Sequence, residues 1–516
     1  MGAGIAQLAC LSGARTLVYD ADREALERGI ERIRAQLDRG AARGRWSPED
    51  ASAAAGRLEA VAGLEQLEAC ELVIEAAPER LSLKRELFGR LEDGVVGDEC
   101  VLASNTSSLL VTAIASGLRH PERVVGMHFF NPPPVMRLLE VVAGEQSGSD
   151  ALAVARAAGE AMGKHVIDAH DGPGFLVNRC NRPFGLEALK LLQEGVASVD
   201  EIDRICRLGG GFRMGPFELM DLVGVDVGLE VARSFYEQSF GEPRWRPSPI
   251  AARTVAAGRL GRKSGRGYYD YSGGTDSYRP EDPEPLRVGG GDGVVVIVGE
   301  SPLAVELAMA ARSAGWDAAS ASEGAVPFLI LDLLDSGDAS DAPLQGGPQA
   351  ICCTGGSLAA LDPGGGAVGF HALVPLSECR LIELTRGAES TGSAVDAAER
   401  FFATLGKHTA WVGDAPGLVL GRIVCQLVNE ASFAISEGIG SAEDIDAGYV
   451  HGLNYPRGVL AWADEIGIDQ VLAVLDSLFE EHHDERYRAA PALRRMVWSG
   501  RVGQQTGEGF FAYEER

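Results

Sequence analysis

The chain has 516 residues, 47 basic and 74 acidic side chains, and a net charge of −27. A chain of this length is too long for one hydrophobic core, so several domains are expected. The negative charge argues against binding nucleic acid or an anionic membrane over the whole surface, and a phosphorylated ligand would need a local arginine cluster.

The nine cysteines are scattered, with no C-x-x-C pair and no histidine-rich neighbourhood. Cysteines in this pattern usually act as small apolar side chains, so we expect no metal site and a reducing, cytoplasmic compartment. The N-terminus has no basic stretch ahead of an apolar one, and no apolar run reaches transmembrane length. We therefore expect a protein that does not enter a membrane.

Residues 1–171 alternate short β-branched runs with longer stretches of helical periodicity. This alternation favours a parallel, doubly wound α/β sheet, which assigns 1–171 to a Rossmann-like domain. The expected strands are 16–20, 71–76, 100–105 and 123–130, and the expected helices are 21–41, 82–92 and 149–163.

Residues 172–271 lack strand-like runs and predict a helical domain. Residues 272–292 are rich in Gly, Pro and charge, which indicates a linker without a core of its own. The expected helices of this domain are 175–194, 199–208, 217–239 and 248–258.

After the linker the pattern begins again. G-V-V-V-I-V-G at 293–299 predicts a buried strand followed by a turn and a helix. The segment 369–387 then repeats 126–144, and 413–422 repeats 170–179, both at an offset of 243 residues. Because one offset holds over such different segments, we infer a tandem duplication. The second copy comprises a reduced Rossmann-like domain at 293–412 and a second helical domain at 413–516.

The chain opens with M-G-A-G-I-A-Q, which predicts a helix start, and the next strand ends at Asp20. In dinucleotide-binding folds, glycine at a helix start lets a pyrophosphate approach, and an acidic residue about 20 positions on accepts the ribose hydroxyls. Gly2 and Asp20 match that pattern. Taken alone the match is weak, because glycines near helix starts and Asp at strand ends are common.

The segment G-M-H-F-F-N-P-P-P-V-M-R-L-L-E carries a stronger signal. A strand delivers His128 into a proline-rich loop, and Glu140 follows twelve residues later in an apolar run. A buried carboxylate is costly unless it is paired, and a nearby imidazole is a suitable partner. Such a pair makes the histidine a candidate general base. The alternative is a His–Glu pair that only locks two strands.

The chain resembles the 3-hydroxyacyl-CoA dehydrogenases over nearly its whole length. The matching segments are MGAGIAQLACLSG, LVYD, VIEAAPERLSLKRELF, ASNTSSL, GMHFFNPPPVMRLLEVV, DGPGFLVNR and GPFELMDLVG. The resemblance implies a Rossmann-like domain and an all-α domain of the 6-phosphogluconate-dehydrogenase-like type, both duplicated. It also implies oxidation of an (S)-3-hydroxyacyl-CoA with NAD as hydride acceptor.

By the same resemblance, His128 takes the proton of the 3-hydroxyl group and Glu140 orients it. Ser107 and Asn178 contact the substrate oxygen or thioester and the nicotinamide region. The cofactor-binding set implied by the resemblance is Gly2, Asp20, Glu79, Lys84, Ser107, Asn131 and Lys263.

Several of these residues have plainer interpretations. Ser107 and Ser108 could cap the helix that follows, Asn178 could be a helix cap, and Lys84 could lie on a solvated helical face.

Asp20 favours NAD over NADP, because it would repel a 2′-phosphate. A phosphate-binding patch for CoA, or else a solvated Arg/Glu face, is expected from Arg28, Arg32, Arg34, Arg39, Arg43 and Arg45.

The sequence departs from the family pattern in two places. The family's first strand and first two glycines are not present ahead of Met1, so NAD binding is expected to be weak if Met1 is the true start. The second copy keeps His371 and Glu383 but has Gly356 for Ser107 and Gly421 for Asn178. We therefore expect a structural role for the second copy, whose helical domain would replace the contact through which single-repeat relatives pair.

The sequence thus predicts an NAD-dependent dehydrogenase of acyl-CoA substrates in fatty-acid or phenylacetate catabolism. It does not choose between 3-hydroxybutyryl-CoA and 3-hydroxyadipyl-CoA, nor does it fix the oligomeric state. Two rival hypotheses remain: a dehydrogenase of free hydroxy acids on the same fold, and a non-catalytic scaffold.

Overall fold

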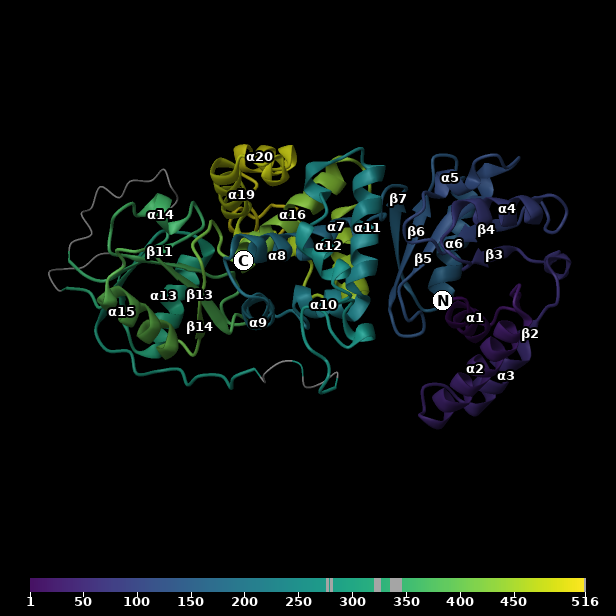
Figure 1. Cartoon of the computed structure of the whole chain (residues 1–516), viewed down its shortest axis with the longest axis horizontal. Helices are drawn as coiled ribbons and strands as arrows, with labels where there is room; N and C mark the ends of the chain where they lie inside the picture. The colour runs from purple at the N-terminus through teal and green to yellow at the C-terminus, as the bar shows by residue number, and fades with distance from the viewer. Residues whose placement is uncertain (275–277, 279–281, 320–325, 335–345, 515–516) are drawn as a thin grey trace. The chain divides into compact units, whose positions relative to one another are not determined.

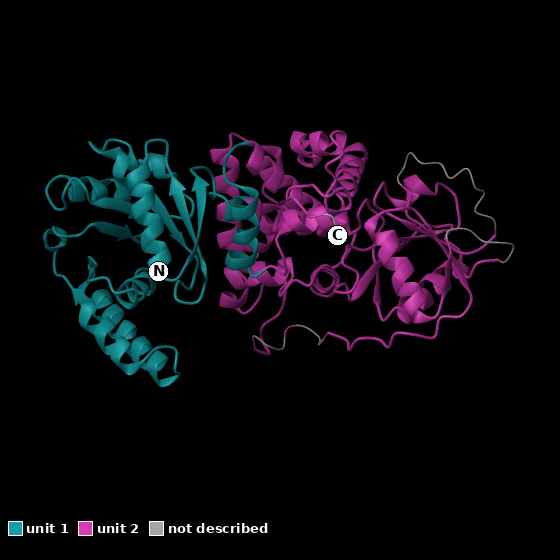
Figure 2. Cartoon of the chain, turned by 180° about the vertical axis from the view of Figure 1, so that it is seen from behind, with its two compact units in different colours: residues 1–179, 437–454 teal, residues 180–436, 455–516 magenta. Residues whose placement is uncertain are grey.

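The computed structural model describes residues 1–274, 278, 282–319, 326–334 and 346–514 (Figure 1). The chain forms two compact units (Figure 2). Unit 1 contains residues 1–179 and 437–454, and unit 2 contains residues 180–436 and 455–516. Each unit therefore combines segments from both copies of the duplicated sequence.

The main sheet of unit 1 has the strand order β3-β4-β5-β6-β7. Neighbouring strands are parallel except β5 and β6, which are antiparallel, so the expectation of a wholly parallel sheet is wrong at this pair. The expected strands at 71–76, 100–105 and 123–130 are confirmed. The bounds are β3 (Leu72–Glu75), β4 (Val101–Ser104), β5 (Val124–Phe129), β6 (Leu138–Ala143) and β7 (His165–His170).

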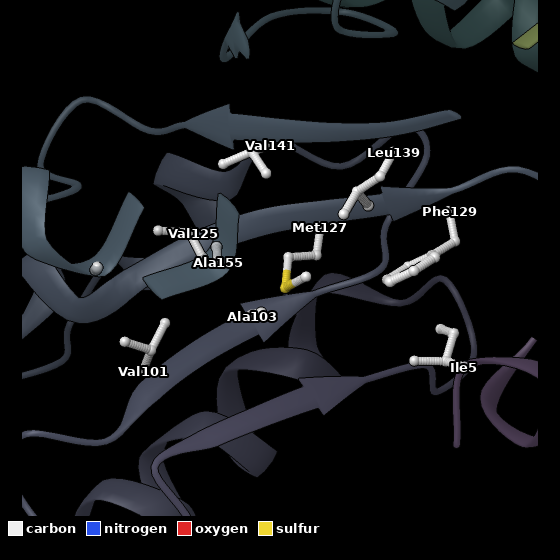
Figure 3. Close-up of a cluster of buried hydrophobic side chains, with 10 residues drawn as sticks. Ile5, Val101, Ala103, Val125, Met127, Phe129, Leu139, Val141 and Ala155 are labelled. Carbon is white, nitrogen blue, oxygen red and sulfur yellow. The ribbon is translucent and has the colours of Figure 1, made fainter. Parts of the chain in front are cut away.

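One face of this sheet packs on the helices α6 (Ser149–Ala161) and α1 (Gly2–Leu11). Figure 3 shows the resulting cluster, to which β5 contributes Val125, Met127 and Phe129. Successive side chains of a strand point to opposite faces. His128 lies between Met127 and Phe129 on β5, so its side chain is directed to the other face of the sheet. Glu140, which lies opposite His128 on β6, is directed to that same face.

The strand expected at 16–20 is present as β1 (Thr16–Val18), but it lies outside the main sheet. It pairs in parallel with β2 (Leu58–Ala60) in a separate two-stranded sheet. The helix α2 (Arg23–Ala42) packs its apolar face against α3 (Pro48–Arg57) and α1. The sequence did not predict α3, β2 or β7. The remaining short elements of the first copy here are η1 (Leu64–Leu67), α4 (Leu81–Glu92), α5 (Val111–Ala115), η2 (Pro121–Arg123) and α7 (Val177–Cys180).

Unit 2 contains a seven-stranded sheet of order β14-β13-β12-β11-β10-β8-β9. It repeats the sheet of unit 1, including the antiparallel pair β12–β13. Here β8 lies between β10 and β9, whereas β3 and β1 of unit 1 are not paired with each other within the described ranges. The bounds are β8 (Val294–Val298), β9 (Asp317–Ala319), β10 (Leu329–Asp332), β11 (Gln349–Cys352), β12 (Val368–His371), β13 (Leu381–Arg386) and β14 (His408–Trp411).

The helices of this second Rossmann-like domain are α13 (Pro302–Ala314), α14 (Leu358–Leu361) and α15 (Gly392–Thr404). The expected linker at 272–292 lies partly outside the described residues. Its described end is mostly exposed and runs along the second Rossmann-like domain, where Gly289 N donates to Thr404 O at 2.8 Å.

The two helical domains pack on each other through α8 (Arg182–Glu194) and α16 (Leu420–Ser436). The first continues with α9 (Val199–Gly210), α10 (Pro216–Val223), α11 (Val225–Gln238), η3 (Pro243–Trp245), α12 (Pro249–Ala256) and η4 (Arg262–Ser264). The second contains α17 (Ala442–Ala447), η5 (Gly448–Gly452), α18 (Val459–Ile466), α19 (Ile468–His482), η6 (Glu485–Tyr487), α20 (Pro491–Trp498) and η7 (Gln504–Thr506). The predicted helices of the first domain are confirmed, with 175–194 divided into α7 and α8 at Asn181 and 217–239 divided at Gly224.

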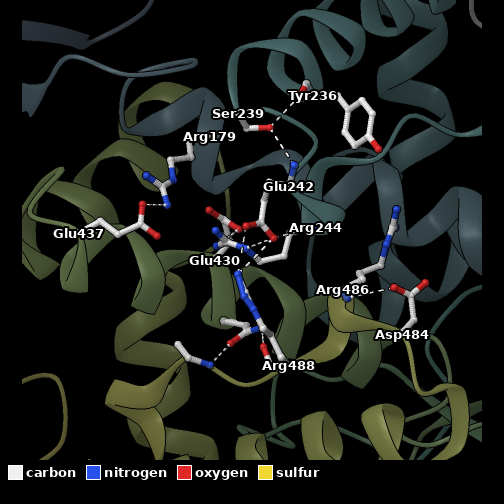
Figure 4. A network of polar contacts seen from close by, with 12 residues as sticks. Arg179, Tyr236, Ser239, Glu242, Arg244, Glu430, Glu437, Asp484, Arg486 and Arg488 are labelled. Atoms are coloured by element: carbon white, nitrogen blue, oxygen red, sulfur yellow. Dashed lines mark hydrogen bonds and ion pairs between the residues drawn. The ribbon is translucent and has the colours of Figure 1, made fainter.

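A buried ion pair holds the two helical domains together. Arg422 of α16 has no exposed side-chain surface, and its Nε donates to Glu187 Oε1 of α8 at 2.6 Å. The Tyr487 hydroxyl bridges the pair, accepting from Arg422 at 2.7 Å and donating to Glu187 at 3.0 Å. A second polar network in the same unit joins Arg244 to Glu430 at 2.8 Å (Figure 4).

We expect Arg422→Met to lower the free energy of unfolding by about 3–5 kcal/mol, because it leaves the Glu187 carboxylate buried without its main partner. Urea unfolding followed by circular dichroism measures this. The double variant Arg422→Met/Glu187→Leu should recover most of the loss. Equal stability of the single variant and the wild-type chain would contradict the buried pair.

Candidate active site

The predicted pair of His128 and Glu140 is confirmed. The antiparallel register of β5 and β6 places the two residues directly opposite each other. His128 Nδ1 lies 2.6 Å from Glu140 Oε2, and both side chains are buried. The two residues are twelve positions apart in the sequence, and the proline-rich loop between them returns the chain from β5 to β6.

The second oxygen of Glu140 is also satisfied. Its Oε1 accepts hydrogen bonds from the backbone N–H groups of Leu176 at 3.1 Å and Val177 at 2.9 Å, at the start of α7. Three donors therefore hold one buried carboxylate, which compensates for the loss of water. Because Nδ1 is held by the carboxylate, Nε2 is the ring nitrogen that can accept a proton from a ligand.

Two aromatic rings enclose the imidazole. The ring centroid of His128 lies 4.7 Å from that of Phe130 and 5.8 Å from that of Phe175. Phe175 is fully buried. These rings limit the access of water to the pair, which strengthens the interaction between the two groups.

Ser107 lies on the exposed loop after β4, and a glutamate holds that loop. Glu79 Oε1 accepts from the N–H of Ser107 at 3.0 Å and of Ser108 at 3.1 Å, and from the Thr106 hydroxyl. Burial raises the pKa of Glu79, but the hydrogen bond from Thr106 and the charge of Lys84 outweigh it, so the pKa is lowered overall. The loop is thus tied to an ionised carboxylate.

Lys84 is completely buried, so the interpretation of it as a lysine on a solvated helical face is wrong. Its Nζ donates to both oxygens of Glu75 at 2.9 Å and lies 3.2 Å from Glu79 Oε2. The Ser104 hydroxyl also donates to Glu75 at 2.6 Å. Lys84 therefore joins the ends of β3 and β4 to the Ser107 loop.

The interpretation of Ser107 and Ser108 as helix caps is wrong. Helix α5 begins at Val111 after Leu110, with no side-chain cap. Instead Asp171, sixty residues on, accepts from the backbone N–H groups of Val111 at 3.0 Å and Thr112 at 2.8 Å. The sequence signal for this was the aspartate of D-G-P-G, which recurs as Asp414 in the second copy and accepts from Leu358 and Ala359 in the same way.

Asn178 lies in the first turn of α7, directly after Val177, and Asn131 lies exposed at the end of β5. The proline loop that follows Asn131 is held by Lys164, which the sequence analysis missed. The Lys164 ammonium donates to the carbonyls of Pro133 and of Met136, the latter at 2.7 Å, and burial lowers its pKa to about 8. The repeated G-K-H, at 163–165 and 406–408, was the available signal.

Gly2 begins α1, and Asp20 lies exposed just after β1. Both line one pocket of about 1320 Å3, together with the end of β3. An acidic residue at a strand end beside a helix N-terminus suits an adenosine ribose and its phosphate, so the residues present fit a dinucleotide. The pocket exceeds a usual small-molecule site of roughly 300–1,000 Å3, because it continues between β1 and β3. His128 is not among its lining residues.

Lys263 belongs to unit 2, where its Nζ lies 2.6 Å from Asp226 Oδ1. This contact is the largest cause of the lowered pKa of Asp226. In unit 1, Arg28 and Arg32 of α2 line the large pocket, and Arg28 Nη1 donates to Glu24 at 3.3 Å. Of the six predicted arginines, Arg28 and Arg32 line the pocket, and Arg28 is at the same time paired with acids.

The second copy has the same register but lacks the paired hydrogen bond. His371 lies opposite Glu383, yet the two Glu383 oxygens accept separately from Val419 N at 2.7 Å and Leu420 N at 3.0 Å. Across the described part of the chain, His371 Nδ1 has no hydrogen-bond partner. A methyl group at Gly421 would come within 2.2 Å of His371 Cε1, so the imidazole occupies the space that an asparagine would need.

The second site also has no room for a substrate. His371 lines a cavity of about 30 Å3 with Cys352, Thr354, Cys425 and Gln470. That volume holds one or two water molecules. Burial lowers the pKa of His371 to about 4 and raises the pKa of Glu383 to about 8. Burial therefore disfavours the charged form of each group, so the two do not form an ion pair as charged partners would.

Fold and site define an oxidoreductase with a Rossmann-like domain, and comparison with known families agrees. Residues 1–172 match the 3-hydroxyacyl-CoA dehydrogenase NAD binding domain. Residues 174–271 and 417–513 each match the C-terminal domain of the same family, which confirms the duplication. The chain belongs to the 3-hydroxyacyl-CoA dehydrogenase family.

Among known proteins, the chain is 34% identical to the 3-hydroxyadipyl-CoA dehydrogenase of Escherichia coli K12, covering 96% of this chain and 95% of the relative. A crystal structure of 3-hydroxybutyryl-CoA dehydrogenase from the same strain aligns with a TM-score of 0.81 at 34% identity, over 97% of each chain. A probable 3-hydroxybutyryl-CoA dehydrogenase of Bacillus subtilis is 40% identical, over 52% of this chain and 94% of its own. No helix within the described residues is long and apolar enough to span a membrane.

The buried neutral His371 predicts a pH effect on stability. Its folded pKa of about 4 lies below the ordinary value of 6.5, so as pH falls below 6.5 the unfolded chain gains a proton that the folded chain does not. We expect His371→Phe to remove this penalty and to reduce the loss of stability between pH 7 and 5 by on the order of 2 kcal/mol. Urea unfolding at both pH values measures it, and parallel losses in the two proteins would contradict it.

Proposed function

We propose that the chain oxidises (S)-3-hydroxyacyl-CoA thioesters to 3-oxoacyl-CoA with NAD as hydride acceptor. The observation that carries this is the buried pair of His128 Nδ1 and Glu140 Oε2 at 2.6 Å. Family membership supports the CoA thioester over a free hydroxy acid, and the intact pair argues against a non-catalytic scaffold.

In this proposal His128 Nε2 takes the proton of the 3-hydroxyl group. The hydrogen on C3 leaves with its bonding electron pair, as a hydride, while the C3–O bond becomes a carbonyl. Bound NAD supplies the acceptor for that hydride. Glu140 stabilises the imidazolium through Nδ1–H and keeps Nε2 directed to the substrate. The two backbone N–H groups on Oε1 hold the Glu140 carboxylate in place for this task.

We assign Ser107 and Asn178 to the substrate oxygen or thioester and the nicotinamide region. The Ser107 loop is held by Glu79, and Asn178 follows the N–H donor of Val177. Both positions are thus fixed by the same carboxylates that organise the site. The loss of both side chains in the second copy, at Gly356 and Gly421, supports their assignment to catalysis in the first.

The cofactor set is assigned as follows. Asp20 binds the adenosine ribose and favours NAD over NADP, and Gly2 lets the pyrophosphate approach α1. Glu79 and Lys84 lie near the ribose and phosphates, with Lys84 acting mainly by holding the loop. Asn131 is assigned to the nicotinamide, and the assignment of Lys263 to the cofactor rests on the family resemblance alone. The CoA nucleotide binds the arginine face of α2, with Arg28 and Arg32 directed to the pocket.

We also propose that the chain works in the cytoplasm and that its second helical domain replaces a dimer contact. All nine cysteines are free thiols, which suits a reducing compartment. The packing of α8 on α16 through Arg422 and Glu187 supports an internal equivalent of subunit pairing.

The base assignment predicts that His128→Gln lowers kcat for NADH-dependent reduction of acetoacetyl-CoA by about 10²–10⁴-fold. The matched control is His371→Gln at the equivalent position of the second copy, which should keep kcat within twofold. NADH oxidation followed at 340 nm measures both.

Full activity of His128→Gln would exclude this residue as the base. Loss of activity in His371→Gln alone would transfer the chemistry to the second copy. Turnover of free acetoacetate at a rate equal to that of acetoacetyl-CoA would favour the free-acid alternative.

A further inference from the structure

A segment of the second helical domain belongs to unit 1. Residues 437–454, which we call the exchanged arm, contain α17 and η5 and are grouped with residues 1–179 (Figure 2). The arm packs on β6 and β7, and His170 N at the end of β7 donates to Ile439 O at 2.9 Å. The second copy thereby contributes to the domain that carries His128.

The exchange is reciprocal. The first helical domain contributes α9, which is equivalent to the arm at the offset of 243, to the second Rossmann-like domain within unit 2. Helix α9 packs on β13, and Arg380 N donates to Leu208 O at 2.8 Å. Each sheet is therefore covered by a helical segment of the other copy.

Three glycines let the arm approach the candidate active site closely. A methyl group at Gly440 would lie 2.6 Å from Leu176 Cδ2, and one at Gly448 would lie 2.6 Å from Val177 Cγ2. At Gly452 it would lie 2.6 Å from Leu138 Cδ2. Contacts this short mean that no side chain fits at these positions without moving the neighbouring residue.

Two of the residues that the arm contacts also hold the His–Glu pair. Leu176 and Val177 donate the two backbone hydrogen bonds to Glu140 Oε1. Gly452 also approaches Phe130, whose ring lies 4.7 Å from that of His128. The arm therefore packs behind the groups that fix the pair.

The second copy has its close contact at a different position, where a methyl group at Gly210 of α9 would lie 2.9 Å from Leu420 Cδ1. At the offset of 243, Gly440 and Gly448 correspond to Ala197 and Ile205, and only Gly452 has a glycine counterpart, Gly209. A methyl group at Gly209 would lie 3.2 Å from Leu420 Cδ2, a looser contact than at Gly452. In that copy the carboxylate gives one oxygen to each N–H group and has no bond to its histidine.

We infer that the exchanged arm is a positioning element for the His128–Glu140 pair. It sets the backbone of residues 176–177 so that both N–H groups bind Oε1 and leave Oε2 for His128. The second copy then serves catalysis through its arm rather than through His371. This inference rests on the roles proposed above for His128 and Glu140.

The test compares matched substitutions in the two arms. Gly452→Ala should lower kcat about tenfold with KM within twofold, and it should shift the midpoint of kcat against pH, because the environment of the base changes. Gly209→Ala, the equivalent change in the other arm, should leave kcat and its pH midpoint unchanged. A folded Gly452→Ala protein with wild-type kcat and pH midpoint would overturn the inference.

A milder pair covers the case in which Gly452→Ala does not fold. Ile445 of the arm and Ile202 of α9 are equivalent and both buried. Ile445→Val should lower kcat two- to threefold and shift the pH midpoint, while Ile202→Val should change neither. Equal effects of the two substitutions would mean that the arm stabilises the fold without positioning the His128–Glu140 pair, and would overturn the inference.

A readout without turnover separates this inference from the proposed reaction. In 15N-histidine-labelled protein, the Nδ1–H proton of His128 bound to Glu140 should give a downfield NMR signal. Gly452→Ala should shift that signal and Gly209→Ala should not, whether or not acetoacetyl-CoA is a substrate. An unshifted signal in both variants would overturn the positioning role while leaving the proposed reaction intact.

Discussion

The active-site geometry depends on how one buried carboxylate is satisfied. Glu140 lies opposite His128 only because β5 and β6 run antiparallel in an otherwise mainly parallel sheet. Once buried, the carboxylate needs donors on both oxygens. Two backbone N–H groups bind Oε1, so Oε2 remains for the imidazole. A parallel pairing of these strands would not bring the two side chains together in a short return.

The second copy keeps the contacts that hold the loops of the fold but not the hydrogen bond of the His–Glu pair. The scaffold contacts recur at equivalent positions: Asp171 and Asp414 each accept two N–H groups, and Lys164 and Lys407 each bind two loop carbonyls. The reactive pair does not recur, although both residues are present. In the second copy each carboxylate oxygen binds one N–H group, and the histidine is neutral and unpaired among the described residues.

The sequence predicted those features that local pattern determines. Periodicity located most strands and helices, and spacing paired His128 with Glu140 and revealed the duplication. It did not predict β7, because H-V-I-D-A-H mixes polar residues into an edge strand. The spacing alone could not distinguish the two His–Glu pairs, because it is the same in both copies. Only the glycines at 356 and 421, in place of Ser107 and Asn178, indicated a difference between them. Nor could the sequence predict the exchanged arm, because no local sequence pattern specifies on which of the two Rossmann-like sheets a helix packs.

The two copies also differ in the open space beside their sheets. In unit 2 the sheet is continuous from β14 to β9, with β8 between β10 and β9, and only about 30 Å3 remains beside His371. In unit 1 a pocket of about 1320 Å3 extends from the cradle at Gly2 and Asp20. The space beside the buried His371 holds one or two water molecules and is too small for a thioester. The arm faced a different constraint: any side chain larger than hydrogen at Gly448 would press on Val177, and through it on Glu140. In the second copy, the exchanged arm therefore contacts the residues around Glu140 and tolerates no side chain at Gly448 without displacing them.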